Sequence, residues 1–431
     1  MSKNLFKSVS MVLILRLASA GVLFLFFVFL SRQLGKHEVG LFFLGFAATS
    51  ILSGLGSLGL YRIVVRLLGA HDQPQEGYLR GTIISRALLA VTAASSVGAL
   101  GLALLANPVA HWFFQQPELV PILRIMALAI VPMTISMTCG NMLEGLNKPL
   151  ATVVVLNLLL PLFSLLAGSV WWWQGQLQFA SQGAWIFVAG YIATMLVALR
   201  LVYSLYQSGR QIDQELPLTV TREQLWSGTT ALVLIMLTDQ TIRWAGQIVT
   251  GMWLSAGDVA VLATAHRTAA SLGLILQAIN KVVSPRFAAL HKRGEYEQIW
   301  PVLVHTIKVS TGYALPAFIL MVLCSSWLMA IFGKGFSQFW YILVILSLGY
   351  LVNAVTGPIA QLLIMVGQEK LLRNITFLTG LFALVATVAL TAIGGLVGSA
   401  LATCLVLIIQ NTVVLGHVSR LYRAKAVPVH S

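Results

Sequence analysis

The sequence predicts an all-α integral membrane protein of about 12 transmembrane helices. We expect two six-helix bundles related by a two-fold axis along the membrane normal. Three observations predict this class. First, 58% of the 431 residues are hydrophobic and only 9% are charged, a balance typical of membrane proteins. Second, apolar runs of bilayer-spanning length follow one another along the chain. Third, short motifs recur in the two halves of the sequence.

The apolar runs are the strongest signal, because a helix needs about 20 apolar residues to cross the hydrocarbon core. Twelve runs reach this length, and the segments between them are too short to hold a further folded domain. They cover residues 9–30, 39–60, 82–106, 119–143, 150–173, 183–206, 227–252, 258–283, 300–324, 338–364, 374–393 and 396–418.

A polar segment near the middle of the chain, QSGRQIDQELPLTVTREQLW, carries Pro217 and predicts a linker between two halves. The expected organisation is an N-terminal six-helix bundle (1–206), a cytoplasmic linker (207–226), a C-terminal six-helix bundle (227–418) and a basic cytoplasmic tail (419–431).

The two halves share short motifs that indicate an internal repeat. LGKHEVGLFFL (34–44) begins the second run, and LSAGDVAVLAT (254–264) begins the eighth; both place an acid and a valine where a helix starts. EGLNKP (144–149) and MVGQEK (365–370) end the fourth and tenth runs. Six spans in each half would keep both copies in the same orientation, as in known transporters. The alternative is convergent loop chemistry.

The distribution of basic residues predicts the orientation. Of the 27 lysines and arginines, 19 fall in the segments and nearby helix ends on one side of the predicted membrane, three fall on the other side, and five lie deeper inside spans. By the positive-inside rule, the richer side is cytoplasmic and holds both termini. The formal charge of +14 is spread over short loops rather than gathered in a basic domain, so we expect no nucleic-acid partner.

The seventh run carries a polar stripe at the depth of the membrane centre. Residues 226–253 begin and end with tryptophan, as expected at the two interfaces. Asp239, Gln240, Arg243 and Gln247 share one helix face between these tryptophans. Charges at this depth are costly and typically mark a transport path. The alternative is an Asp239–Arg243 pair with a purely structural role.

Apart from those at the cytoplasmic helix ends, five basic residues lie inside predicted spans: Arg16, Arg124, Arg243, Arg267 and Lys308. Asp239 is the one comparably deep carboxylate, so the spans carry an excess of positive charge. A guanidinium group suits phosphate oxygens because it forms paired hydrogen bonds. Arg124 and Lys308 lie near span ends and can extend to the headgroups. We therefore favour Arg16, Arg243 and Arg267 as cavity residues.

The sequence contains no nucleotide-binding, hydrolase or metal-binding motif, so we predict neither an enzyme nor a cofactor. Cys139, Cys324 and Cys404 lie in apolar runs without metal-ligand spacing, and we interpret them as core residues. His266 is interpreted as a packing histidine.

The chain resembles polysaccharide exporters of the multidrug/oligosaccharidyl-lipid/polysaccharide (MOP) superfamily, and most of all the bacterial O-antigen flippases of the Wzx type. The resemblance covers nearly the whole length. It is carried by LGKHEVGLF, GLGSLGLYRIVVR (54–66), EGLNKP, GDVAVLATAHRTAASL (257–272), SPRFAAL (284–290), FGKGF (332–336) and MVGQEK. One departure is TDQTIRWAG in the seventh span, where many relatives are more apolar.

The resemblance implies a MATE-like fold that opens alternately to either side of the bacterial inner membrane. It also implies transfer of undecaprenyl-diphosphate-linked oligosaccharide from the inner to the outer leaflet. Partners would be membrane lipids, a polysaccharide polymerase, a chain-length regulator, and a proton or sodium ion for coupling.

The residues expected to serve this function all lie in predicted spans. Asp239 is the candidate coupling residue. The candidate substrate-binding residues are Arg16, Arg243, Arg267, Gln240 and Gln247.

Two other function classes stay open. A cation-coupled small-molecule antiporter is favoured by Asp239 and disfavoured by the excess of positive charge. A membrane enzyme such as an O-antigen polymerase would need more room than the short outer loops give.

Overall fold

The computed structural model describes residues 3–70, 77–175, 177–209 and 229–422. Every regular element in these ranges is a helix, so the prediction of an all-α protein is confirmed. The chain divides into two compact units, Met1–Leu237 (unit 1) and Thr238–Ser431 (unit 2). The predicted linker from residue 210 onward and the predicted tail from residue 423 onward lie outside the described residues, so those boundaries stay a prediction.

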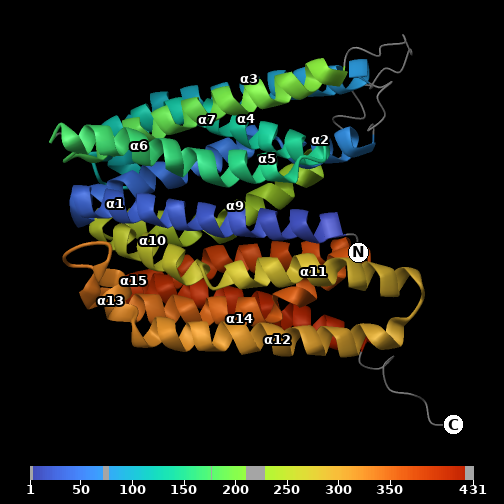
Figure 1. Cartoon of the computed structure of the whole chain (residues 1–431). Helices are drawn as coiled ribbons and strands as arrows, with labels where there is room; N and C mark the ends of the chain where they lie inside the picture. Colours follow the sequence, from blue (N-terminus) through green and yellow to red (C-terminus); the bar gives the residue numbers. More distant parts are fainter. Residues whose placement is uncertain (1–2, 71–76, 176, 210–228, 423–431) are drawn as a thin grey trace. The chain divides into compact units, whose positions relative to one another are not determined.

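Unit 1 is organised around a central helix, α4 (Leu119–Gly145), which packs against α1, α2, α3 and α7 (Figure 1). The most apolar 18-residue stretch of α4 is 61% buried, more than that of any other candidate span in this unit. The other elements are α1 (Lys3–Gly56), α2 (Leu60–Ala70), α3 (Gly77–Pro108), η2 (Val109–Phe113), α5 (Pro149–Val153), η3 (Val154–Leu158), α6 (Leu159–Trp173) and α7 (Ala180–Gly209).

Helix α1 contains the first two predicted spans. The segment between them, 31–38, was expected to be a loop, but it is helical except at Gly35, whose φ of 76° and ψ of 173° form a kink. This backbone conformation is open essentially to glycine alone, which explains why the chain turns there. The apolar part of α1, Ile14–Gly56, is 43 residues long, about twice the length that one crossing needs.

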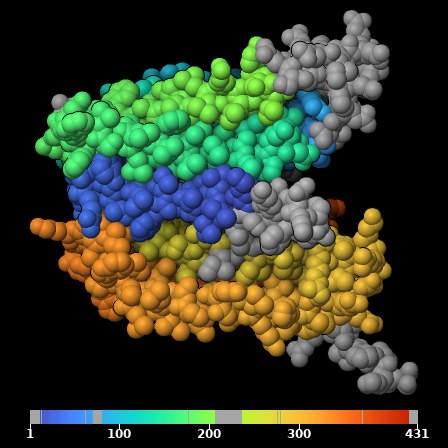
Figure 2. Space-filling model, viewed as in Figure 1, coloured from blue at the N-terminus to red at the C-terminus, as the bar shows by residue number. Residues whose placement is uncertain are grey.

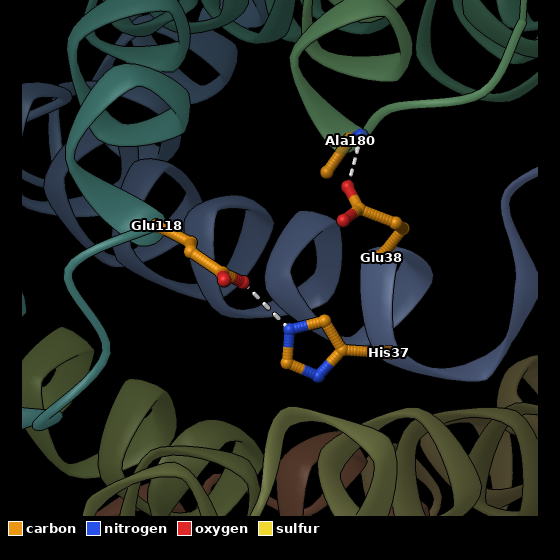
Figure 3. A network of polar contacts seen from close by, with 4 residues as sticks. All are labelled: His37, Glu38, Glu118 and Ala180. Atoms are coloured by element: carbon orange, nitrogen blue, oxygen red, sulfur yellow. Dashed lines mark hydrogen bonds and ion pairs between the residues drawn. The ribbon is translucent and has the colours of Figure 1, made fainter.

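Polar contacts join three helices of unit 1 just beyond this kink (Figure 3). His37 Nε2 lies 2.8 Å from Glu118 Oε2, at the residue that precedes α4. Glu38 Oε2 accepts a 2.6 Å hydrogen bond from the backbone N–H of Ala180, the first residue of α7. A carboxylate at a helix start satisfies a donor that the helix leaves open and complements the helix dipole. These contacts fix α1 to α4 and α7 at one end of the unit.

Unit 2 has a corresponding central helix, α14 (Trp340–Met365), which packs against α10, α11, α12 and α15. The remaining elements are α9 (Thr229–Trp253, whose first residues belong to unit 1), α10 (Ala256–Ala270), α11 (Gly273–Lys292), α12 (Tyr296–Leu323), α13 (Ser325–Ala330), η5 (Ser337–Phe339) and α15 (Glu369–Tyr422). Helix α15 combines the last two predicted spans. It kinks at Gly395 (φ 56°, ψ −133°), within the predicted loop 394–395.

Eight helical stretches of the described chain are long and apolar enough to cross a membrane. Two of them, 43 and 52 residues long, each cover a pair of predicted spans, so the eight correspond to ten of the twelve predictions. The other two predictions fall on α9, which carries the polar stripe, and on the successive helices α10 and α11. Helix α12 lies on the surface of unit 2 that Figure 2 shows in gold and orange. It exposes large apolar side chains such as Tyr313, Leu320 and Leu323, as a lipid-facing helix does.

Candidate functional site

Unit 2 encloses a polar cavity of about 330 Å³ between α9, α10, α14 and α15. Its polar side chains are Asp239 and Arg243 from α9, His266 from α10, Tyr350 and Asn353 from α14, and Thr387 and Thr403 from α15. Ile242, Gly246, Ala383, Val406 and Leu407 complete the lining. Both halves of α15 contribute because the helix kinks back at Gly395. A concave site with a few converging polar groups is the usual form of a ligand site.

Asp239 and Arg243 form an ion pair that is open to the cavity. Arg243 Nη2 lies 3.3 Å from Asp239 Oδ2, and the side chains are 58% and 61% exposed. This distance exceeds the 2.7–2.9 Å typical of a strong charge-assisted hydrogen bond. An exposed pair at this spacing on a helix stabilises it by only about 0.3–0.5 kcal/mol. An incoming anion could therefore replace Asp239 beside Arg243 at little cost.

His266 and Tyr350 form a second polar pair in the cavity. Tyr350 Oη lies 2.9 Å from His266 Nε2, and the two rings meet edge to face with centroids 5.4 Å apart. Arg243 and Arg267 both lie within electrostatic range of the two side chains. The contact with Tyr350 agrees with the interpretation of His266 as a packing histidine whose polar atoms are satisfied. The sequence carried no signal for its partner, which is 84 residues away.

Arg267 lies next to this cavity but is not among its lining residues. Its guanidinium Nη1 donates a 3.0 Å hydrogen bond to the carbonyl oxygen of Ala263, one turn earlier in α10. The side chain is half-buried. The backbone bond uses one of the five N–H donors of the guanidinium, and an anion in the cavity would lie within reach of its charge.

Only part of the predicted polar stripe of α9 lines the cavity. Asp239 and Arg243 line the cavity, whereas Gln240 and Gln247 are not among its lining residues. On an α-helix the two glutamines lie about 80–100° around the axis from Asp239. Gln247 is buried with 8% exposure. Their proposed contact with substrate stays a prediction.

Three predicted intramembrane cations are not among the lining residues of this cavity. Arg16 is a half-buried residue of α1 in unit 1, one turn before Ser19, which donates to the carbonyl oxygen of Leu15 at 2.7 Å. Its proposed role beside Arg243 and Arg267 stays a prediction. Arg124 and Lys308 are exposed on α4 and α12. Their exposure agrees with the expectation that both extend toward headgroups.

One group of side chains in the described residues has the chemistry of metal ligands. His37, Glu38 and Glu118 offer ligand atoms that all lie within 4.8 Å of one another. Two of these atoms already bind each other, and Glu38 caps α7, as Figure 3 shows. In this arrangement the three side chains serve as a connection between helices.

The chain shares its fold with solved multi-pass membrane proteins. It superposes on an inward-facing multidrug resistance MATE family transporter with a TM-score of 0.76 and 13% identity, over 97% of this chain and 100% of that one. For the lipid II flippase MurJ in an inward closed conformation, the TM-score is 0.74 with 13% identity, over 95% of this chain and 87% of that one. The predicted fold class, an all-helical multi-span membrane protein, is confirmed.

The chain belongs to the polysaccharide biosynthesis protein family, whose model matches residues 5–291. A curated relative is the probable low-salt glycan biosynthesis flippase Agl15 of Haloferax volcanii. It is 25% identical over 401 residues, which cover 92% of this chain and 80% of the relative. The family is one of transporters, so the prediction that the chain is not an enzyme is confirmed.

Proposed function

We propose that this protein is a flippase for lipid-linked glycans. It moves undecaprenyl-diphosphate-linked oligosaccharide, an O-antigen or related repeat unit, from the inner to the outer leaflet of a bacterial cytoplasmic membrane. The observation that carries the proposal is the similarity over 92% of the chain to a probable glycan flippase, within a polysaccharide biosynthesis family. The Wzx-like motifs found in the sequence supply the finer substrate. Both termini are cytoplasmic in this proposal.

The unit 2 cavity supports an anionic group in the substrate. Among the described residues, its arginine, Arg243, is paired with Asp239 through an open, long contact, and the charge of Arg267 acts in the same region. A diphosphate offers several oxygens in the geometry that a guanidinium binds with two parallel hydrogen bonds. Asn353 and the Tyr350 hydroxyl add neutral polar groups suited to phosphate or sugar oxygens. Arg16, Gln240 and Gln247 complete the proposed substrate-binding set.

Asp239 is the proposed coupling residue. Without substrate, Arg243 forms an ion pair with Asp239 at 3.3 Å. A diphosphate that replaces Asp239 beside Arg243 would leave the carboxylate next to another anion. Repulsion between like charges then favours uptake of a proton by Asp239. Substrate and proton would thus favour the same state of the transporter, and substrate release restores the ion pair. A sodium ion is the alternative coupling ion.

Transport in reconstituted vesicles tests the function. The purified chain is placed in proteoliposomes with a fluorescent undecaprenyl-diphosphate-linked oligosaccharide, and transbilayer movement is followed by a membrane-impermeant quencher. We expect movement well above that in vesicles without protein. Efflux of cationic dyes with no movement of the lipid-linked glycan would contradict the proposal and favour the antiporter function.

The same vesicles test the coupling through Asp239. Asp239→Asn mimics the protonated carboxyl group and leaves Arg243 without its charged partner. We expect the variant to bind the lipid-linked glycan and to lose any dependence of movement on a proton gradient. A gradient dependence equal to that of the wild type would exclude the coupling role and leave Asp239 a structural partner of Arg243.

A further inference from the structure

Unit 1 contains a second hollow, a groove of about 710 Å³ between α3 and α7. The groove arises because α3 and α7 both pack mainly against α4 and contact each other little. Ile84 and Leu88 of α3 face Leu199 and Val202 of α7 along its apolar walls. A volume of this size lies within the roughly 300–1,000 Å³ range of small-ligand sites.

The groove also carries polar side chains and a positive charge. Thr82 and Ser85 of α3 and Arg200 and Tyr203 of α7 all line it, and no carboxylate is among the described residues that line it. Arg200 is exposed, and no described carboxylate forms an ion pair with it. Its guanidinium stays charged at any physiological pH and offers five N–H donors. The groove therefore combines apolar walls with a cation that has no charged partner in the described chain.

The position of the groove along the spans matches the boundary between acyl chains and headgroups. The apolar span of α7 ends at Leu205. Five residues separate Arg200 from this end, about 8 Å along a helix. The span of α3 begins at Arg80, so the groove residues of α3 occupy its first turns. An arginine at this depth reaches phosphate groups, and Leu88 and Leu199 lie deeper in their spans than the polar residues of the groove.

We propose that this groove binds an anionic phospholipid of the surrounding bilayer. One acyl chain lies along the walls formed by Ile84, Leu88, Leu199 and Val202, and the phosphate contacts Arg200. Three properties of the groove select this occupant: apolar walls in a membrane span, an arginine among the lining residues, and no acidic residue in the described part of the lining. Basic pockets between membrane helices are known binding places for anionic headgroups. The site is separate from the polar cavity, which lies wholly in unit 2.

Native mass spectrometry of the full-length chain in detergent tests this proposal with phosphatidylglycerol as the probe. We expect the chain to retain phosphatidylglycerol about tenfold more strongly than phosphatidylcholine, which is about 1.4 kcal/mol. Arg200→Gln should remove this preference, and Arg200→Lys should keep part of it. The matched control is Arg286→Gln, an exposed arginine of α11 outside the groove, which should retain the lipid as the wild type does.

A second variant tests the apolar walls independently of the charge. Ser85→Phe places a ring in the groove at an exposed position and should lower retention of phosphatidylglycerol while Arg200 is intact. It also serves if Arg200→Gln gives no folded protein. Equal retention in wild type, Arg200→Gln and Ser85→Phe would overturn the proposal. Displacement of bound phosphatidylglycerol by equimolar polyprenyl phosphate would also overturn it, because the groove would then belong to the carrier lipid.

Discussion

The hollows of the two units differ in what they can bind. The groove of unit 1 is about 710 Å³, with apolar walls and one charged lining residue, Arg200. The cavity of unit 2 is about 330 Å³ and gathers Asp239, Arg243, His266 and Tyr350. Mutual contacts hold these four side chains in two pairs, whereas Arg200 has no charged partner in the described chain. A paired polar cavity suits a ligand that arrives and leaves, and an apolar groove suits a lipid that stays.

The largest expected effect is the loss of transport when the unit 2 cavity loses its arginine. Arg243→Ala removes a charge-assisted contact of about 1.5–3 kcal/mol, so we expect flipping to fall roughly 10- to 100-fold. Arg243→Lys should be intermediate, because lysine cannot make the paired contact. Complementation of an O-antigen-deficient strain, at matched protein levels, measures both variants.

The control for this comparison is a cation outside the cavity. Arg124→Ala changes an exposed arginine of α4 and should leave surface glycan near the wild-type level. Arg16→Ala and Arg267→Ala, by contrast, should behave like Arg243→Ala if they bind the same substrate. Normal surface glycan in all three variants would exclude them as a binding set.

The kinks of the two long helices come next in size. Gly35→Ala and Gly395→Ala force a side chain into backbone conformations that cost about 1–3 kcal/mol outside glycine. We expect both variants to lower the unfolding temperature of the purified protein. Gly21→Ala is the matched control, a helical glycine of α1 with open space around it, and it should leave that temperature unchanged or raise it. A loss of stability at Gly395 alone would show that the kink of α1 relaxes.

A smaller difference in stability is expected between substitutions of the two acids that belong to the repeated motif, one in each unit. Glu38 accepts from the start of a different helix, α7, whereas Asp258 caps its own helix through Ser255. Glu38→Gln should destabilise the protein by about 1–2 kcal/mol and Asp258→Asn by about 0.5–1 kcal/mol, because only the first joins distant segments. Thermal unfolding of the two variants side by side measures the difference. Equal losses would mean that the contact to α7 adds nothing beyond a local cap.

The smallest effect concerns the neutral pair of the cavity. Tyr350→Phe removes the hydroxyl that binds His266 and keeps the ring in place. The same hydroxyl is proposed to bind a phosphate or sugar oxygen of the substrate. A neutral hydrogen bond of this kind contributes about 0.5–1.5 kcal/mol, so we expect substrate affinity to fall about 2- to 10-fold. Titration with lipid-linked oligosaccharide measures this change. An unchanged affinity would limit Tyr350 to a packing role.

The sequence predicted features that depend on neighbouring residues better than features that depend on the fold. The Asp239–Arg243 pair followed from helical spacing alone, and its contact is present in the structure. The His266–Tyr350 pair joins different helices, and no local pattern marks it. The groove at Arg200 was also not predicted from the sequence, because a cation near a span end was interpreted as part of the cytoplasmic charge. Its walls become visible only when α3 and α7 pack on α4.

The number and the boundaries of the helices show the same difference between local features, which the sequence predicted, and features that depend on the fold. Hydrophobic runs predicted ten spans at positions where apolar helical stretches occur. The expected loop at 31–38 is instead helix with one kinked residue, because Gly35 alone can take the required backbone angles. The sequence does not distinguish a glycine that kinks a continuous helix from a glycine that ends a helix. Only the backbone conformation in the structure does so.

Binding of a diphosphate to the unit 2 cavity is the central claim, and calorimetric titration of the purified chain tests it most directly. Undecaprenyl diphosphate is titrated into wild type, Arg243→Ala and Arg124→Ala in the same detergent, with undecaprenol as the uncharged comparison. The account predicts that wild type and Arg124→Ala bind the diphosphate alike and that Arg243→Ala binds it at least about tenfold more weakly. Equal affinity of all three proteins for undecaprenyl diphosphate would contradict the account. An affinity of the wild type for undecaprenol equal to that for the diphosphate would also contradict it.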